Sequence, residues 1–345
     1  MHAAFFRQHG GPEVMEYGDL PEPPPPGPGE VLVAVKAAAM NRLDKWVRDG
    51  WPGLKLELPH ITGSDAAGVV IAVGAHVSGW QPGDRVCINS NVGCGECSFC
   101  VAGRDNLCER WHLLGESKAG LAAERVVVPA RQLLRVPEAF PLEQAAAAGL
   151  VYQTAWHSLI TRGGLQAGES VLIVGAGGGV NTASIQIAKL AGCTVYVVGS
   201  DARKLELARS LGADVLIDRS QVDWGKEVFR LTNRRGVDVV VDNVGAATLM
   251  TSLRAARKGG RILTVGNTSG PKFEFDNRFM FARHLSFIGS TMSTRAEYAT
   301  VMGLVFAGKL KPVIDSVFPL SEIRAAHEKM ERGDVMGKIV LQVAG

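Results

Sequence analysis

The pattern of hydrophobic and polar positions changes character near residue 141. Before that point, short apolar stretches end at glycines and other turn residues, which is typical of β-strands. We expect strands at residues 31–38, 66–73 and 84–89, and a strand pair formed by residues 125–129 and 133–136. The first part of the chain is therefore predicted to be an irregular, mainly β domain.

After residue 141, apolar runs alternate with helical stretches. Strands are expected at residues 171–174, 194–198, 215–218, 237–242, 261–266 and 285–289. Helices are expected at residues 142–163, 182–191, 203–211, 224–232 and 247–256. Short apolar strands separated by helices indicate a parallel sheet covered on both faces, and six of them match the doubly wound sheet that binds dinucleotides. The predicted fold class is α/β.

The last part of the chain changes pattern once more, from residue 298 onward. It reads as a helix, an extended segment at 312–318, a second helix and a final strand at 338–343. We expect this part to return to the first domain. A length of 345 residues agrees with roughly two domains.

Composition and charge exclude several classes of protein. The sequence is 46% hydrophobic and 21% charged, which suits a globular chain and argues against disorder. A net charge of +3 is too small to indicate a nucleic-acid or acidic-membrane partner. No apolar run approaches the length of a membrane span, and the first residues lack the pattern of a signal peptide. We therefore expect a soluble cytoplasmic protein.

Four of the six cysteines fall in one short segment with the spacing C-x2-C-x2-C-x7-C: Cys94, Cys97, Cys100 and Cys108. A chain without an export signal keeps its thiols reduced, which favours a metal site over a disulfide knot. The last gap is too long for a ferredoxin-type iron–sulfur run, whereas four thiolates suit a closed zinc site. We predict one structural Zn²⁺.

A glycine-rich turn follows the first of the six parallel strands and opens a helix. Its residues are Gly175, Gly177, Gly178, Gly179 and Val180. Backbone N–H groups at such a turn suit a pyrophosphate, so we expect a dinucleotide cofactor here. The third glycine of the fingerprint, which permits close helix–strand packing, is missing, and Asn181 is expected to hold the helix slightly away from the strand.

The end of the second parallel strand distinguishes NAD from NADP. An acidic residue at that point binds the ribose 2′-hydroxyl of NAD. Gly199 stands there in this chain, and Ser200, Arg203 and Lys204 follow, which suit a 2′-phosphate. We therefore expect NADPH, with NADH as the alternative if Asp201 is the acid that binds the ribose.

These features, with three further motifs, resemble those of the medium-chain dehydrogenase/reductases. The motifs are PHITGSDAAGVV at 59–70, PGDRV at 82–86 and GKIVL at 337–341. The family includes zinc alcohol dehydrogenases and zinc-independent quinone and enone reductases. The resemblance covers essentially the whole chain and implies a Rossmann domain inserted in a mainly β, GroES-like catalytic domain, with the nicotinamide in the cleft between them.

The resemblance also implies domain boundaries and further cofactor contacts. The catalytic domain would comprise residues 1–150 and 293–345, with a structural zinc lobe at 91–110, and the Rossmann domain residues 151–292. The additional cofactor-binding residues are expected to be Thr154, Asn243, Val244, Gly266, Asn267, Ser290, Thr291, Met292 and Lys338. A homodimer or homotetramer is expected by analogy, with residues 285–292 extending the sheet between subunits.

The departures from the family pattern concern a second, catalytic zinc. Zinc alcohol dehydrogenases hold it with a Cys, a His and a third ligand, and the aligned positions here are Asn41, Ser64 and Leu150. Asp65 replaces the neighbouring Glu, and Leu43 stands where those enzymes have a proton-relay hydroxyl. Amide, hydroxyl and apolar side chains are poor zinc ligands, so we expect no catalytic zinc.

Without a Lewis acid, hydride transfer to a quinone or an activated C=C bond is the easier chemistry. The segment 40–46 is similar to the quinone-reductase version, in which Asn replaces Cys. We expect Asn41 to donate a hydrogen bond to the substrate and Asp44 to orient it. Tyr152 is a candidate proton donor, with a packing role as the alternative.

The sequence is thus interpreted as an NADPH-dependent reductase of quinones or α,β-unsaturated carbonyl compounds. Three alternatives remain open at this point. One is an alcohol dehydrogenase with a rebuilt metal site. The second is an acyl-CoA enone reductase, which would need a basic groove for the phosphates of CoA. The third is a non-enzymatic NADPH-binding sensor or structural protein.

Overall fold

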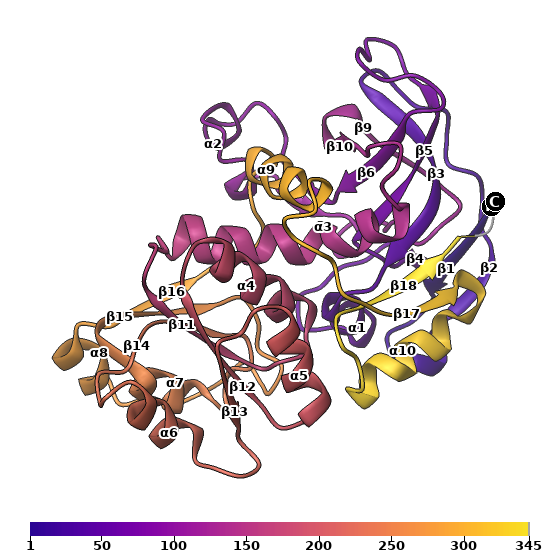
Figure 1. The fold of residues 1–345 in the computed structure, drawn as a ribbon. Helices are drawn as coiled ribbons and strands as arrows, with labels where there is room; N and C mark the ends of the chain where they lie inside the picture. The colour runs from indigo at the N-terminus through magenta and orange to yellow at the C-terminus, as the bar shows by residue number, and fades with distance from the viewer. Residues whose placement is uncertain (344–345) are drawn as a thin grey trace. The chain divides into compact units, whose positions relative to one another are not determined.

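A computed structural model describes residues 1–343 of the chain (Figure 1). The chain divides into two compact units, one made of Met1–Val151 with the chain from Ser293 onward, the other of Tyr152–Met292. Helix α3 (Leu142–Trp156) runs through the point of division. Residues 344 and 345, the last of the predicted catalytic domain, lie outside the described residues.

The first unit is built on a seven-stranded sheet. Its strands are β3 (Glu30–Ala39), β5 (Asp65–Val73), β6 (Arg85–Asn89), β9 (Arg125–Pro129), β10 (Leu133–Arg135), β17 (Ile314–Pro319) and β18 (Lys338–Gln342). The order is β10-β6-β5-β3-β18-β17, and β9 also pairs with β3. Strand β18, near the C-terminus, lies antiparallel to β3 with Val340 opposite Ala39. The last part of the chain therefore completes the sheet that the first part begins.

The predicted pairing of residues 125–129 with residues 133–136 is wrong. Both strands form, but β9 pairs with β3 and β10 pairs with β6. The 3-10 turn η3 (Ala130–Gln132) separates them and redirects the chain. A short turn between two apolar runs predicts a hairpin from sequence alone, whereas the partners here are supplied by distant strands.

The remaining elements of the first unit are small. Strands β1 (His2–Phe6), β2 (Glu16–Asp19) and β4 (His60–Ile61) form one sheet, and β7 (Asn91–Val92) pairs with β8 (His112–Leu113). The helices are α1 (Arg42–Asp49), α2 (Ser98–Val101), α9 (Arg295–Phe306) and α10 (Ile323–Arg332), with 3-10 turns η1 (Pro12–Val14), η2 (Asp105–Leu107) and η5 (Leu320–Glu322).

The second unit contains the predicted doubly wound parallel sheet, which confirms the fold class. Its strands are β11 (Ser170–Val174), β12 (Thr194–Gly199), β13 (Val215–Asp218), β14 (Val237–Asp242), β15 (Ala256–Thr264) and β16 (Ser286–Gly289), in the order β13-β12-β11-β14-β15-β16. Every residue of β14 is buried, as expected for a central strand covered on both faces. The carboxyl ends of all six strands meet at one edge, because the sheet is parallel.

Helices cover this sheet: α4 (Gly179–Leu190), α5 (Ala202–Ser210), α6 (Trp224–Leu231), α7 (Leu249–Ala255) and α8 (Arg278–Arg283). Helix α4 begins three residues before the predicted start, because the glycine turn itself enters the helix. The predicted helix at 142–163 is α-helical to Trp156 and continues as a π-helix, η4 (His157–Arg162). No helix among the described residues is long and apolar enough to cross a membrane.

Candidate functional site

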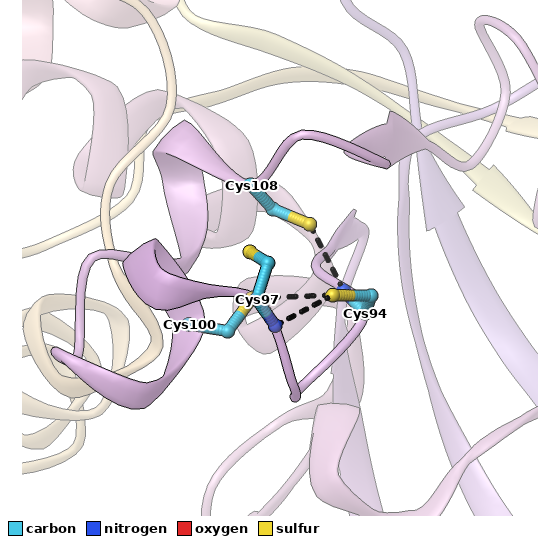
Figure 2. A group of neighbouring side chains, drawn as sticks. All are labelled: Cys94, Cys97, Cys100 and Cys108. Atoms are coloured by element: carbon cyan, nitrogen blue, oxygen red, sulfur yellow. Dashed lines mark hydrogen bonds between the residues drawn. The ribbon is translucent and has the colours of Figure 1, made fainter.

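The four clustered cysteines converge on one point of the first unit (Figure 2). Cys94 follows β7, Cys97 caps the amino end of α2, Cys100 lies in α2, and Cys108 follows η2. Their sulfur atoms all lie within 4.8 Å of one another. Within residues 1–343, no other group of three or more His, Cys, Asp or Glu side chains is placed to share a metal ion.

Backbone N–H groups surround these sulfur atoms. The amides of Cys97 and Arg110 donate to the sulfurs of Cys94 and Cys108, respectively, each at 3.3 Å. A hydrogen bond from the Arg110 side chain, with the Cys97 amide, lowers the pKa of Cys94 to about 6. These donors favour the thiolate of Cys94, whereas burial raises the pKa of Cys100 to about 12 in the absence of a metal. The four convergent sulfurs fit the tetrahedral Zn²⁺ that the spacing predicts.

A second cluster includes one of the three positions that the sequence analysis aligns with the ligands of the catalytic zinc of alcohol dehydrogenases. We call it the Asp65 cluster: Asn41, Asp44, Asp65 and Lys338. Their side chains are between 1% and 6% exposed. The Asp65 carboxylate accepts hydrogen bonds from the Asn41 amide at 2.9 Å, from the Lys338 ammonium at 2.9 Å and from the Leu150 backbone at 2.6 Å. The Lys338 ammonium also donates to the Asn41 side-chain oxygen.

The backbone around Asp65 is shaped to admit its carboxylate. A Cβ atom at Gly149 would lie 2.3 Å from a carboxylate oxygen of Asp65, so any larger residue would displace that oxygen. Ser64, the neighbour of Asp65, is fully buried, and its hydroxyl has no hydrogen-bond partner among the described residues. Of the three positions aligned with zinc ligands, Asn41 and Leu150 therefore bind Asp65 and Ser64 precedes it.

Asp44 holds the segment that presents Asn41. No helix was predicted for residues 40–46, but α1 begins at Arg42 with Asn41 as its N-cap. The Asp44 carboxylate accepts the backbone N–H of Asn41 at 2.6 Å and that of Gly63 at 3.1 Å. Asn followed three residues later by an acid is a capping signature that would have predicted this helix start. Asp44 therefore holds the backbone of Asn41 and Gly63 in place, whereas Asp65 and Lys338 orient the side-chain amide of Asn41.

Burial dominates the electrostatics of Asp44. It raises the pKa of this carboxyl from 3.8 to about 6, although the two backbone hydrogen bonds and the Lys338 charge oppose the shift. The Asp65 charge adds to the increase. Two acids and one lysine therefore share this buried region.

The predicted cofactor residues of the second unit gather at the carboxyl edge of its sheet. Ser200 follows β12, Asn243 and Val244 follow β14, Gly266 and Asn267 follow β15, and Ser290, Thr291 and Met292 follow β16. The Asn243 side chain accepts the Val265 backbone N–H at 3.0 Å and so joins two of these segments. Parallel α/β sheets bind ligands at this edge, so the arrangement suits a dinucleotide.

The glycine turn is tied to the strand that precedes it by Asn181. The Asn181 amide donates to the carbonyl oxygens of Val174 at 3.1 Å and Gly175 at 2.9 Å. Gly175 has a φ of 109°, where a side chain would be strained, and a Cβ there would lie 2.7 Å from the Asn181 amide nitrogen. Asn181 therefore bridges helix and strand by hydrogen bonds, in place of the glycine that the fingerprint uses for close packing.

Two basic side chains lie beside this turn and at the start of α5. The alkyl chain of Lys204 covers the turn, since a Cβ at Gly177 would lie 2.9 Å from its Cδ. Asp201 is the N-cap of α5, and its carboxylate accepts the backbone N–H groups of Arg203 at 2.8 Å and Lys204 at 3.2 Å. The Arg203 guanidinium, 3.3 Å from the same carboxylate, lowers the pKa of Asp201. Asp201 thus has a structural role in the helix start.

Three further residues were predicted to transfer a proton or to bind the cofactor, and each has different surroundings in the structure. Tyr152 is 1% exposed, its hydroxyl accepts a hydrogen bond from Gln186 at 2.9 Å, and burial raises its pKa. Thr154 is buried, with its hydroxyl 3.9 Å from the Met292 sulfur. Lys338, predicted as a cofactor ligand, lies in the Asp65 cluster of the first unit, a neighbourhood that sequence analysis did not identify.

Known protein families and solved structures match both units of this chain. A family model described as zinc-binding dehydrogenase matches residues 179–307, and one described as alcohol dehydrogenase GroES-like domain matches residues 27–138. Crotonyl-CoA reductase from Streptomyces collinus is 33% identical over 93% of this chain and 80% of its own. Quinone oxidoreductase from Homo sapiens is 30% identical over 99% and 97%. A crystal structure of an NAD-dependent alcohol dehydrogenase superposes with a TM-score of 0.96 at 45% identity, with 100% of each chain covered.

Proposed function

Because the chain belongs to the medium-chain dehydrogenase/reductase superfamily and is an oxidoreductase, we propose that it reduces quinones or α,β-unsaturated carbonyl compounds with NADPH. The family and the cysteine cluster support a nicotinamide cofactor and a structural zinc. The proposal adds three points: the class of substrate, the phosphorylated cofactor, and chemistry without a catalytic zinc.

One observation carries the proposal: the Asp65 cluster lacks a zinc ligand set and holds a cation of its own. The aligned positions supply an amide, a hydroxyl and an apolar side chain, none of which replaces thiolate or imidazole. The Asp65 carboxylate, the remaining candidate ligand, is occupied by the Lys338 ammonium. Zinc would have to displace a buried ion pair to bind there.

Hydride transfer without a Lewis acid suits a conjugated substrate. The bound cofactor would supply the hydride. Charge that develops on an enone or quinone is delocalised onto its oxygen, so hydrogen-bond donors are sufficient to stabilise it. Asn41 has one amide hydrogen left after its bond to Asp65, and we assign that hydrogen to the substrate oxygen. Asp44 would keep Asn41 in place through the backbone.

The cofactor would occupy the carboxyl edge of the second unit. Backbone N–H groups of the turn at Gly177, Gly178 and Gly179 suit the pyrophosphate, since α4 begins there. Lys204 and Arg203 supply positive charge for a 2′-phosphate, and Asp201 is engaged as a helix cap. These contacts favour NADPH. NADH is the competing cofactor, and a relative of known structure is named NAD-dependent.

Tyr152 is given no proton-transfer role in this proposal. A phenol that is buried, hydrogen bonded to Gln186 and raised in pKa is a poor donor to a substrate. Its contacts support packing inside the second unit, the alternative for this residue. The zinc that Cys94, Cys97, Cys100 and Cys108 would hold has no open coordination position, so its proposed role is to fix the lobe around it.

We also propose that the chain forms a homodimer or homotetramer through β16. This strand is at the edge of the six-stranded sheet, and most of its side chains are exposed. Phe287 on the strand contacts Phe273, and both are more than a third exposed. An open, apolar sheet edge is a favourable place for a second copy to add its own strand.

A substrate panel tests the proposal. NADPH oxidation should accompany reduction of quinones and enones, with little oxidation of simple alcohols. Efficient, zinc-dependent alcohol oxidation would instead support a zinc-type alcohol dehydrogenase. Preference for crotonyl-CoA over the matched free enone would support the activity after which the Streptomyces relative is named. Binding of NADPH without turnover of any member would contradict the proposed reaction.

A further inference from the structure

We infer that the ammonium group of Lys338 is the cation that binds the substrate oxygen, so that a lysine of this chain acts where zinc alcohol dehydrogenases use a metal. The inference rests on the proposed function, because it assigns the group that receives the developing charge in that reaction. It differs from the role predicted from sequence, in which Lys338 binds the cofactor.

The hydrogen bonds of Lys338 leave one donor for a ligand. Lys338 is the first residue of β18, and its ammonium donates to the Asp65 carboxylate at 2.9 Å and to the Asn41 side-chain oxygen. An ammonium has three hydrogens, and among residues 1–343 these two contacts use two of them. The two fixed contacts orient the third hydrogen, which would otherwise rotate on a flexible side chain.

Asn41 orients the ammonium of Lys338. Asn41 bonds both partners, accepting from Lys338 and donating to Asp65. The three side chains therefore form a closed ring of hydrogen bonds. The ring uses the Asn41 amide hydrogen on the same side as its oxygen, so the other amide hydrogen points away from Lys338 and the substrate oxygen is assigned to the ammonium. A cationic donor that is fixed beforehand can stabilise an oxyanion in the transition state.

Burial makes the charge effective. Lys338 is 3% exposed, so its interaction with a developing oxyanion is weakly screened. Charge-assisted hydrogen bonds are roughly twice as strong as those between neutral groups. The ammonium would therefore contribute more to the rate than a neutral donor would.

A purely structural role explains the buried Lys338 less well than a role in binding the substrate oxygen does. Desolvation offsets much of the attraction within a buried ion pair, so such pairs are weak sources of stability. Ser64, the chain neighbour of Asp65, has a fully buried hydroxyl without a hydrogen-bond partner among the described residues. Buried polar groups are nearly always hydrogen bonded, so this segment has a second polar group that a ligand could satisfy.

In the proposed step, a C–H bond of the reduced nicotinamide would break as a new C–H bond forms at the β-carbon of the enone, which leaves the nicotinamide oxidised. The C=C π electrons move to make a double bond between the α-carbon and the carbonyl carbon, and the carbonyl π pair moves to oxygen, where Lys338 stabilises the enolate. The enolate electrons then return to the α-carbon, which takes a proton from water, and the resulting hydroxide takes a proton from solvent.

Two variants separate the charge of Lys338 from its contribution to folding. Lys338→Met alone leaves the Asp65 carboxylate buried without a counter-ion, which threatens the fold. Lys338→Met combined with Asp65→Asn removes both charges and keeps a polar side chain for the Leu150 and Asn41 contacts. Lys309→Met is the matched control, because Lys309 is exposed in the same unit.

Three measurements are made on each protein. The first is the single-turnover rate of enone reduction by bound NADPH. The second is the dissociation constant of NADPH. The third uses 4-nitrophenol with NADP⁺, and compares the affinity for the yellow phenolate with that for the phenol. The phenolate imitates the charged oxygen of the enolate and reports on the ammonium without any turnover.

We expect the double variant to fold and to lose about tenfold to a hundredfold in rate, as for loss of a charged hydrogen bond. Its preference for phenolate should fall by a similar factor, with little change in NADPH affinity. Recovery of the wild-type rate in the double variant would overturn the inference and make the pair structural. If the affinity for NADPH fell by the same factor as the rate, Lys338 would instead be a cofactor-binding residue, as predicted from the sequence. The inference would also be contradicted if wild type and the double variant had the same preference for phenolate over phenol, or if neither protein bound nitrophenol.

The proposed function can fail separately. A wild-type protein that reduces no quinone or enone would contradict the reaction. The phenolate preference, compared between wild type and the double variant, would still decide whether Lys338 binds an oxyanion.

Discussion

At the scale of residues, Asn41 and Asp44 have been separated into two roles. The Asn41 side chain faces Asp65 and Lys338, whereas the Asp44 carboxylate binds backbone N–H groups. Sequence analysis identified both residues but could not identify Lys338 as their neighbour, since 297 positions separate Asn41 and Lys338. Contacts between distant positions depend on the pairing of β18 with β3, which no local pattern specifies.

Replacing the Asn41 side chain should lower the rate more than it weakens binding. In Asn41→Ala the proposed amide donor is removed and Lys338 loses one orienting contact. We expect a decrease of about tenfold to a hundredfold in the rate of hydride transfer, with a small effect on the Michaelis constant. Stopped-flow measurement of NADPH oxidation checks this, with the exposed Gln8→Ala as control. A variant as fast as wild type would remove Asn41 from the chemistry.

The buried Asp44 predicts a pH dependence of stability with a definite sign. Its pKa is raised from 3.8 to about 6, so the folded protein holds this proton more tightly than the unfolded chain does. The stabilisation is complete below pH 3.8 and is lost as the pH rises through about 6. A shift of about two units corresponds to about 3 kcal/mol.

A comparison of wild type with Asp44→Asn isolates the contribution of Asp44 to the pH dependence, because all other titratable groups are present in both proteins. From pH 4 to pH 7, the free energy of unfolding of the variant should rise relative to wild type by about 2.4 kcal/mol. Denaturant unfolding at both pH values measures the difference. A difference that stays constant with pH would show that Asp44 titrates normally in the folded protein.

At the scale of elements, the parallel strands were predicted better than the loops. Strands β13 and β14 form at the predicted residues, because a short run rich in apolar residues between turn residues specifies each of them locally. The pairing of β9 and β10 was not predicted, because their partners lie far along the chain. The start of α4 and the bridge made by Asn181 depend on side-chain hydrogen bonds at the turn, which spacing alone does not reveal.

The start of α5 predicts how cofactor choice responds to mutation. Arg203→Ala combined with Lys204→Ala removes both proposed partners of the 2′-phosphate, at a cost on the order of 1–3 kcal/mol. The Michaelis constant should therefore rise about tenfold or more for NADPH and little for NADH. Lys226→Ala, an 87% exposed lysine on α6, is the control. Equal increases for both cofactors, or a wild-type preference for NADH, would instead assign the ribose contact to Asp201.

At the scale of the whole molecule, mutations can test whether the structural zinc site and hydride transfer are independent of each other. The cysteine cluster is closed and belongs to the first unit, so its zinc should stabilise a lobe and take no part in hydride transfer. The fold supports many chemistries, and the relatives are named for three of them, so the choice of substrate depends on the residues of the site.

Metal analysis of the purified protein should give one zinc per chain. Cys97→Ser should lose that zinc and lower the unfolding temperature, because one of four convergent ligands is removed. Molecules that remain folded should transfer hydride at nearly the wild-type rate. Cys193→Ser is the control, since this buried thiol lies outside the cluster in the second unit. Two zinc equivalents in the wild type would contradict the single-site account.

The central claim is that reduction proceeds without a catalytic metal, and one measurement tests it directly. The protein is treated with a chelator that removes weakly bound metal, and NADPH-dependent reduction of a quinone and of an enone is measured before and after. The account predicts unchanged rates with the structural zinc retained, since the Asp65 cluster supplies its own cation. Loss of activity on chelation, restored by added Zn²⁺ and accompanied by efficient oxidation of simple alcohols, would contradict it.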